Sequence, residues 1–234
     1  MQHTKIEWVK NEDGTQGYTI NPIKGLCPVD CKDNQGKSYC YAGKMYDRFK
    51  WNPEVRFEPS VFNTLPKKPC RVFIGSTMEL FLFDDWMKFI LNRCQDFPNH
   101  TFQFLTKQPQ NLSKFSPFPE NCWVGVTATD YYSMFRALNG LAYLDGGIQA
   151  KIKFISFEPL LESVKGPRLN LSGVNWVVIG SQTKPYKPPL KIWVDEIIEA
   201  CKKVDIPYFL KNNLRPLLGD NLVQNMPKGV AVDH

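Results

Sequence analysis

Short runs of apolar, β-branched and aromatic residues recur along the chain, and most of them end in a small polar or charged residue. The runs are residues 17–22, 71–76, 101–106, 122–127, 152–159, 175–181 and 207–211. Apolar and polar positions do not alternate strictly within them, which is typical of strands buried on both faces of a parallel sheet. We therefore expect these runs to form a mostly parallel sheet.

Amphipathic segments between the runs predict helices over residues 78–94, 131–144 and 191–204. Strands that alternate with helices favour βαβ units. Seven candidate strands predict an α/β fold, a partial TIM-type barrel that is (β/α)6-like with mostly parallel strands. We see no domain boundary and expect a single domain over residues 1–234. The proline-rich stretch 183–190 is interpreted as a loop over one mouth of the barrel.

The predicted strands carry polar groups at their carboxyl ends, which is the edge where barrels of this type bind ligands. Polar turns after strands would account for some of these groups. Glu158 and Lys211 add charges of opposite sign near the same mouth, which favours a polar ligand. The full set is Gly75-Ser76-Thr77, Thr106-Lys107, Thr127, Ser156-Phe157-Glu158, Gly180-Ser181-Gln182 and Lys211.

Three of the seven cysteines lie within fourteen residues, with the spacing C-x3-C-x8-C. They are Cys27, Cys31 and Cys40. Removing the polar residues Lys32–Lys37 leaves C-x3-C-x2-C, with Tyr39 directly before the last cysteine. This hexapeptide contains a glycine and can loop out, because a few added loop residues cost a fraction of ~1 kcal/mol.

Three thiolates in one loop can each bind one iron of a [4Fe–4S] cluster and leave the fourth iron open. An open iron that chelates the methionine portion of S-adenosylmethionine is the signature of radical enzymes that form a 5′-deoxyadenosyl radical. Two other interpretations stay open. A structural zinc site would need a fourth ligand, and His3, His100 and His234 all lie far from the loop in sequence. The three thiols could also be free.

Composition adds the cellular setting. The chain starts without the apolar core of a signal peptide and has no uninterrupted apolar stretch of ~18 residues, so we expect a cytoplasmic protein without a membrane span. A net charge of +6 is compatible with DNA, RNA or a nucleotide as substrate. Stacking surfaces could come from Trp8, Trp51, Trp86 and Trp193, although the last two lie on predicted helices, where packing is favoured.

Nine short motifs in order along the chain match one known family. They are IEW (6–8), NP-x2-G-x-C (21–27), CYA (40–42), FIGSTMELF (73–81), FLTKQPQNL (104–112), WVGVTATD (123–130), FISFEPLL (154–161), WVVIGSQT (176–183) and PYFLKN (207–212). On these residues the chain resembles the phage- and plasmid-associated, radical-SAM-like family of unknown function with a three-cysteine motif, distantly similar to spore photoproduct lyase. It departs from that family in the six-residue insertion and in Gly180-Ser181-Gln182, where the family usually has glycine-glycine-glutamate.

The resemblance implies a radical S-adenosylmethionine enzyme with a [4Fe–4S] cluster on the three cysteines, in the loop after the first strand. It implies that Gly75, Ser76 and Thr77 hold the methionine amino group, with Glu79 nearby. The further candidates for the cofactor or the substrate are Thr106, Lys107, Thr127 and Ser156. Glu158, Lys211 and Tyr41 are the candidate catalytic residues.

Several questions stay open in this interpretation. An electron donor is required, and the substrate and the hydrogen-atom donor are unknown. Cys70, Cys94, Cys122 and Cys201 do not lie at the carboxyl ends of predicted strands, so Tyr41 or Tyr186 is the substitute donor. The alternatives are a non-enzymatic zinc or iron–sulfur module that recognises nucleic acid in phage–host conflict, and a barrel hydrolase that uses Glu158.

Overall fold

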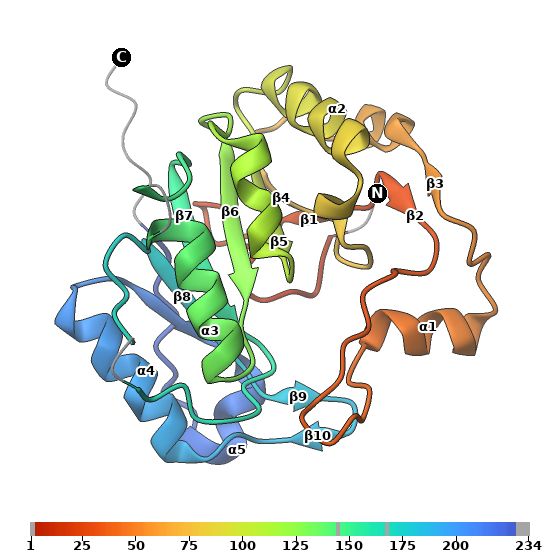
Figure 1. Ribbon diagram of the computed structural model, residues 1–234. Helices are drawn as coiled ribbons and strands as arrows, with labels where there is room; N and C mark the ends of the chain where they lie inside the picture. The colour runs from red at the N-terminus through yellow and green to blue at the C-terminus, as the bar shows by residue number, and fades with distance from the viewer. Residues whose placement is uncertain (1–2, 144–145, 167–168, 228–234) are drawn as a thin grey trace.

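A curled, seven-stranded sheet forms the centre of the protein. The computed structural model describes residues 3–143, 146–166 and 169–227. The sheet is all-parallel, with the strand order β1-β4-β5-β6-β7-β8-β11. The strands are β1 (Tyr18–Ile20), β4 (Arg71–Ile74), β5 (Thr101–Thr106), β6 (Cys122–Thr127), β7 (Ile152–Phe157), β8 (Trp176–Ile179) and β11 (Tyr208–Leu210). Each lies inside one predicted run, and the sheet curls into a half-barrel, so the prediction of a partial TIM-type barrel is confirmed (Figure 1).

Helices on the outer side of the sheet cover the larger hydrophobic core. They are α2 (Asp84–Gln95), α3 (Tyr131–Leu138) and α4 (Lys191–Lys203). The prediction for α4 is confirmed to within one residue. A π-helical turn, Asn139–Tyr143, extends α3, and the last residue of its predicted range, 144, lies outside the described residues. No helix in the described ranges is long and apolar enough to cross a membrane.

The predicted start of the helix over residues 78–94, which corresponds to α2, was wrong. Residues 78–83 are not α-helical: they contain a 3-10 turn, Leu80–Leu82, and α2 begins at Asp84. The side chain of Glu79 caps that turn by accepting from the Phe81 N–H. Gly75 has a φ of +81°, which suits glycine and lets the chain turn as it leaves β4. The Glu79 cap and the turn at Gly75 therefore prevent an α-helix in this segment, although its apolar pattern suits one.

The inner face of the half-barrel carries a second, aromatic-rich core. Phe73, Gln103, Trp123 and Ile152 are register partners across four adjacent strands. Aromatic rings dominate this core, and Gly125 leaves them room, because a Cβ there would lie 2.3 Å from the Phe154 ring. Its buried members are Trp8, Val9, Phe73, Trp123, Ile152, Phe154, Trp176, Val178 and Phe209.

Small elements surround the mouth of the half-barrel. The antiparallel pair β2 (Ile23–Lys24) and β3 (Arg56–Phe57) flanks helix α1 (Tyr41–Phe49), and all three lie between β1 and β4 in sequence. The proline-rich stretch predicted as a loop contains most of a second antiparallel pair, β9 (Gln182–Thr183) and β10 (Tyr186–Lys187). The remaining elements are α5 (Arg215–Leu218) and the 3-10 turns Pro59–Thr64, Pro109–Phe115 and Asn212–Leu214.

Candidate functional site

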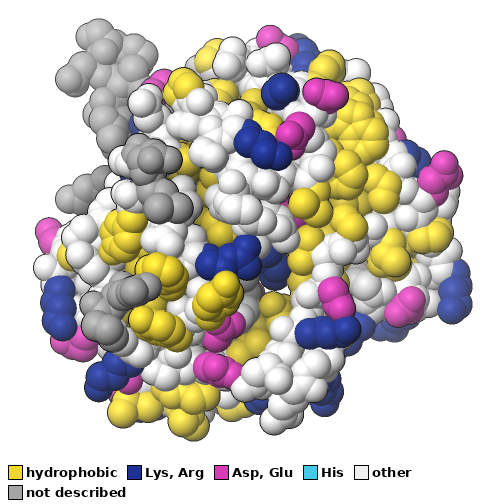
Figure 2. All heavy atoms as spheres, viewed as in Figure 1, with side chains coloured by type: hydrophobic (Ala, Val, Ile, Leu, Met, Phe, Trp, Pro, Cys, Tyr) yellow, Lys and Arg dark blue, Asp and Glu magenta, His cyan; other side chains and the backbone are white. Residues whose placement is uncertain are grey.

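A cavity of about 1000 Å³ opens at the carboxyl ends of the strands. Its walls come from the N-terminal segment, β1, the cysteine loop, α1 and the ends of β4 to β7 and β11. Figure 2 shows a hollow between α3 and α1, with side chains of both charges around it. The cavity therefore lies at the edge where the sequence predicts a ligand site.

The inserted segment between the second and third cysteines folds back on itself. Lys32 and Ser38 form an antiparallel bridge, and the Tyr39 N–H donates to the Cys31 carbonyl oxygen at 3.0 Å. The Asp33 carboxylate holds the turn by accepting from backbone N–H groups inside it. The insertion therefore loops out and returns Cys40 to the neighbourhood of Cys31.

Cys40 caps the N-terminus of α1. Its sulfur accepts from the Gly43 N–H at 3.3 Å. The neighbouring Cys31 thiol, the N–H groups at the start of the helix and the positive charge of Lys107 lower the pKa of Cys40 to about 5. The pKa of Cys31 is raised by the neighbouring Cys40 sulfur and by burial, and its thiol donates to the Val29 carbonyl oxygen at 3.9 Å. Of the two, Cys40 is therefore the one whose thiolate form is favoured.

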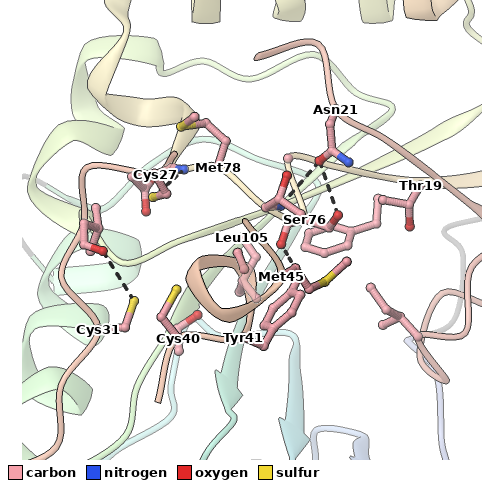
Figure 3. A pocket seen from close by; sticks show the side chains of 18 of the residues that line it. Thr19, Asn21, Cys27, Cys31, Cys40, Tyr41, Met45, Ser76, Met78 and Leu105 are labelled. Carbon is pink, nitrogen blue, oxygen red and sulfur yellow. Dashed lines mark hydrogen bonds between the residues drawn. The ribbon is translucent and has the colours of Figure 1, made fainter. Parts of the chain in front are cut away.

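Cys27 completes the group on the same side of the pocket. Figure 3 shows Cys27, Cys31 and Cys40 together at one end, with Thr19 and Asn21 at the opposite end. The Cys27 sulfur accepts from the Glu79 N–H at 3.4 Å, while burial raises the pKa of its thiol. All three sulfur-bearing side chains line the cavity.

The Glu79 carboxylate is buried beside these thiols and is fully engaged. It accepts from the Thr106 hydroxyl at 2.6 Å and from the Lys107 N–H at 2.8 Å. Burial nevertheless raises its pKa. Glu79 therefore braces the loops after β4 and β5. The Thr106 hydroxyl is also engaged, since it accepts from the Gln108 N–H at 2.8 Å.

The two predicted charges at the far strand ends meet as an ion pair. The Lys211 ammonium donates to the Glu158 carboxylate, and both side chains are largely buried at the pocket wall. Gly180 provides the space, because a Cβ there would lie 2.9 Å from Lys211 Cδ and 3.4 Å from Glu158 Cγ. The pair thus presents a polar but nearly neutral surface to the cavity.

Tyr41 lies between the two ends of the pocket (Figure 3). Its hydroxyl donates to the Ser76 carbonyl oxygen, and burial of the hydroxyl raises the pKa of Tyr41 to about 12, although nearly half of the residue is exposed. The Ser76 hydroxyl donates in turn to the Asn21 side chain at 3.3 Å. Tyr41 therefore keeps its proton and connects α1 to the end of β4.

Thr127 and Ser156 are register partners on the inner face of β6 and β7. Both are buried, and neither hydroxyl has a hydrogen-bond partner among the described residues. Thr127 lines the cavity, whereas Ser156 and Thr106 lie outside its lining. The other predicted site residues all line it: Cys27, Cys31, Cys40, Tyr41, Gly75, Ser76, Thr77, Glu79, Lys107, Glu158 and Lys211.

The N-terminal segment forms part of the pocket wall, which the sequence did not reveal. Thr4, Lys5, Ile6 and Trp8 line the cavity together with Thr19 of β1. Bridges from His3 to Tyr18 and from Lys10 to Gln16 hold this segment beside β1. Trp8 occurs in the IEW motif, but a motif does not indicate which wall of the barrel it forms.

Of the other tryptophans named above, two pack against the outer core and one lines the cavity. Trp86 and Trp193 are partly buried against the outer core, so the preference for packing is confirmed. Trp51 is exposed, lines the cavity and stacks on Phe49 at 5.5 Å between ring centroids.

Cys27, Cys31 and Cys40 line one cavity without the close convergence of a site for a single metal ion. In the described ranges, no three His, Cys, Asp or Glu side chains converge as they would around one metal ion. A cubane cluster binds each thiolate at a different iron, so its ligands need to face one space rather than one point. The three thiols line one cavity, and the pKa of Cys40 is lowered.

Comparison with known proteins gives one family. Residues 3–215 match the family described as "Protein of unknown function (DUF5131)". No curated protein and no solved structure matches the chain. The family match covers every residue that lines the cavity.

Proposed function

We propose, from the premise that the chain belongs to the DUF5131 family, that it is a radical S-adenosylmethionine enzyme. The observation that carries the proposal is the group of three thiols at one end of a large pocket. The sequence resemblance to radical-SAM-like proteins points to the same chemistry. The protein would act in the reducing cytoplasm, where its seven cysteines stay free.

Cys27, Cys31 and Cys40 would hold a [4Fe–4S] cluster. The chemistry supplied at these residues, given an external one-electron donor, would be reductive cleavage of the C5′–S bond of S-adenosylmethionine to methionine and a 5′-deoxyadenosyl radical, which would abstract hydrogen from a substrate. The chain prepares for metal binding through Cys40, because a thiolate binds without first losing a proton.

The neighbouring residues would position S-adenosylmethionine. Gly75, Ser76 and Thr77 line the cavity at the end of β4 and offer backbone groups to the methionine amino group. The Lys107 ammonium has no ion-pair partner in the described ranges, and its charge acts on Cys31 and Cys40. It is therefore the best placed cation for the methionine carboxylate.

The opposite wall would act on the substrate. The Glu158–Lys211 pair can bind a polar group of either charge by exchanging partners, which we expect to orient the substrate. Tyr41 keeps its proton at neutral pH and lies in the cavity wall, so it is our candidate hydrogen-atom donor. The net charge of +6 favours a nucleic acid or a nucleotide as substrate.

The test is anaerobic reconstitution of the full chain with iron and sulfide. We expect about four irons and four sulfides per chain, and dithionite plus S-adenosylmethionine should then give 5′-deoxyadenosine, measured by mass spectrometry. Replacing any cysteine of the trio, as in Cys27→Ala, should abolish both the cluster and the product.

Cys201→Ala is the matched control, because this thiol is buried in the outer core away from the cavity. It should keep full iron content and full 5′-deoxyadenosine formation. Stoichiometric zinc in place of iron, or a cluster that never cleaves S-adenosylmethionine, would contradict the proposal.

A further inference from the structure

The end of the pocket away from the cysteines is lined by aromatic and polar side chains. Trp8 packs on Phe73 at 5.0 Å between ring centroids, and Phe73 is the register partner of Thr19. These three residues all line the cavity, and Figure 3 shows Thr19 across the pocket from the thiols. The wall of this far end is therefore partly aromatic. Its residues come from the N-terminal segment, β1 and β4.

Buried polar atoms at this end lack partners. The Trp8 residue is 1% exposed, yet its indole Nε1–H has no hydrogen-bond partner in the described ranges, and the same holds for the Thr19 hydroxyl. A buried donor or acceptor without a partner destabilises the fold. These groups are explained if a ligand supplies the missing partners.

The charges of the lining favour an anionic ligand. Five basic side chains line the cavity, against the carboxylates of Glu79 and Glu158. Glu79 is bound by the chain itself, and Glu158 is neutralised by Lys211. The five basic residues are Lys5, Lys24, Arg56, Lys107 and Lys211.

One of these cations lies at the far end without an ion pair. Lys24 and Arg56 share the carboxylate of Glu58. Lys107 lies by the thiols and Lys211 is paired with Glu158. Lys5 belongs to the N-terminal segment beside β1 and has no ion-pair partner in the described ranges.

We propose that this far end binds a nucleotide, with its base against Trp8 and Thr19 and its phosphate toward Lys5. A base offers a flat ring for an aromatic wall and edge groups for an indole N–H and a hydroxyl. A phosphate suits an unpaired lysine. That this nucleotide is the substrate rests on the proposed function; that it binds here does not.

The test follows the Trp8 indole N–H directly. The full chain, with Cys27, Cys31 and Cys40 all replaced by serine to exclude paramagnetic iron, is labelled with ¹⁵N at its indole nitrogens, and Trp8→Phe assigns the Trp8 resonance. Each of the four 2′-deoxynucleoside 5′-monophosphates is then titrated in turn. At least one should move the Trp8 resonance saturably, with a Kd below about 1 mM, while the Trp193 resonance stays still.

Two substitutions separate the parts of the ligand. Lys5→Met should weaken binding of the monophosphate about tenfold and leave the corresponding nucleoside unchanged. Thr19→Val should weaken both equally. Lys67→Met is the matched control, because Lys67 is exposed and lies outside the cavity lining, and it should change neither.

The outcomes are distinguishable from failure of the radical chemistry. The inference is overturned if no monophosphate moves the Trp8 resonance, because the cavity end then holds solvent alone. It is equally overturned if S-adenosylmethionine moves that resonance and displaces the monophosphate, since the end then belongs to the adenine of the cofactor. Nucleotide binding without any 5′-deoxyadenosine formation in the wild-type chain would leave this inference intact and overturn the proposed function instead.

Discussion

The seven cysteines form two groups with different surroundings. Cys27, Cys31 and Cys40 line the pocket at its mouth. The other four, Cys70, Cys94, Cys122 and Cys201, are buried in the core on the outer side. Burial raises the pKa of Cys70 to about 11 and that of Cys201 to about 12, whereas the pKa of Cys40 falls to about 5.

The surroundings, and not the residue type, set this difference. Core thiols face apolar side chains and behave as small hydrophobic groups. Cys40 faces backbone N–H groups at the start of α1, the Cys31 thiol and the charge of Lys107, all of which stabilise a negative sulfur. A cysteine at the amino end of a helix in a polar pocket is therefore prepared for metal or redox chemistry, and a core cysteine is not.

The largest expected effect is in alkylation. With metal-free protein at pH 7, iodoacetamide should modify Cys40 at least about tenfold faster than any core cysteine, because Cys40 is ionised and accessible. Its rate should stay flat from pH 8 to pH 6 and fall as the pH drops through about 5. Peptide mass spectrometry at timed intervals gives each rate.

Cys31→Ala sharpens this test. It removes the neighbouring thiol that contributes most to the lowered pKa of Cys40, so the rate profile should move to higher pH. A Cys40 rate that still climbs between pH 7 and pH 9 in the unchanged chain would contradict the comparison.

Glu79→Ala should have the next largest effect, on the polar side of the comparison. It leaves the buried Thr106 hydroxyl and the Lys107 N–H without their acceptor, which should lower the free energy of unfolding by about 2–3 kcal/mol. Urea denaturation measures the loss. Glu120→Ala, at an exposed site, should change stability by less than about 0.5 kcal/mol; equal effects would show that Glu79 is no brace.

Cys94→Ala tests the apolar side. Cys94 is fully buried in the outer core beside Cys122, so its loss should cost about 1 kcal/mol through a small cavity. The alkylation rate of Cys40 should not change. A faster or slower Cys40 would mean that the two groups of thiols are coupled through the sheet.

The smallest expected effect is a pH dependence at His100, beside the core thiol of Cys70. Burial lowers the pKa of His100 below its usual 6.5. The neutral ring accepts from the Cys70 N–H at 3.3 Å and donates to the Pro66 carbonyl oxygen at 3.0 Å. Its stabilisation should therefore be complete above about pH 6.5 and be lost as the pH falls through the lower folded value.

The measurement compares unfolding free energies of the wild type and His100→Asn between pH 8 and pH 5. The gap between the two proteins should narrow as the pH falls. A gap that is constant across this range would contradict the assignment of a neutral, doubly bonded ring.

Sequence reasoning recovered the strands because burial on both faces leaves an unmistakable apolar run, as in residues 122–127. It also recovered most of the pocket lining, since the carboxyl ends of parallel strands must meet at one edge. It did not recover contacts between distant segments. The commitment of Glu79 to the β5 loop and the position of Trp8 at the barrel wall depend on how the sheet curls, which local patterns do not encode.

The start of α2 was also predicted wrongly because contacts with distant residues decide it. Residues 78–83 have an apolar pattern that suits a helix, but the polar groups around Glu79 settle the turn there. Ser156 and Thr106 followed the strand-end rule correctly, yet one packs behind the pocket wall and the other binds Glu79. A position at a strand end places a residue near the mouth without deciding which way its side chain is used.

The cysteine loop is tied to the rest of the protein at widely separated places. The Asn34 side chain donates to Glu162, beyond β7; the Lys44 ammonium donates to the Lys184 carbonyl oxygen, between β9 and β10; and Tyr41 reaches Ser76. The spacing of the three sulfurs therefore depends on contacts that reach across the half-barrel. Loss of any of these contacts should therefore move the three sulfurs apart before the sheet itself unfolds.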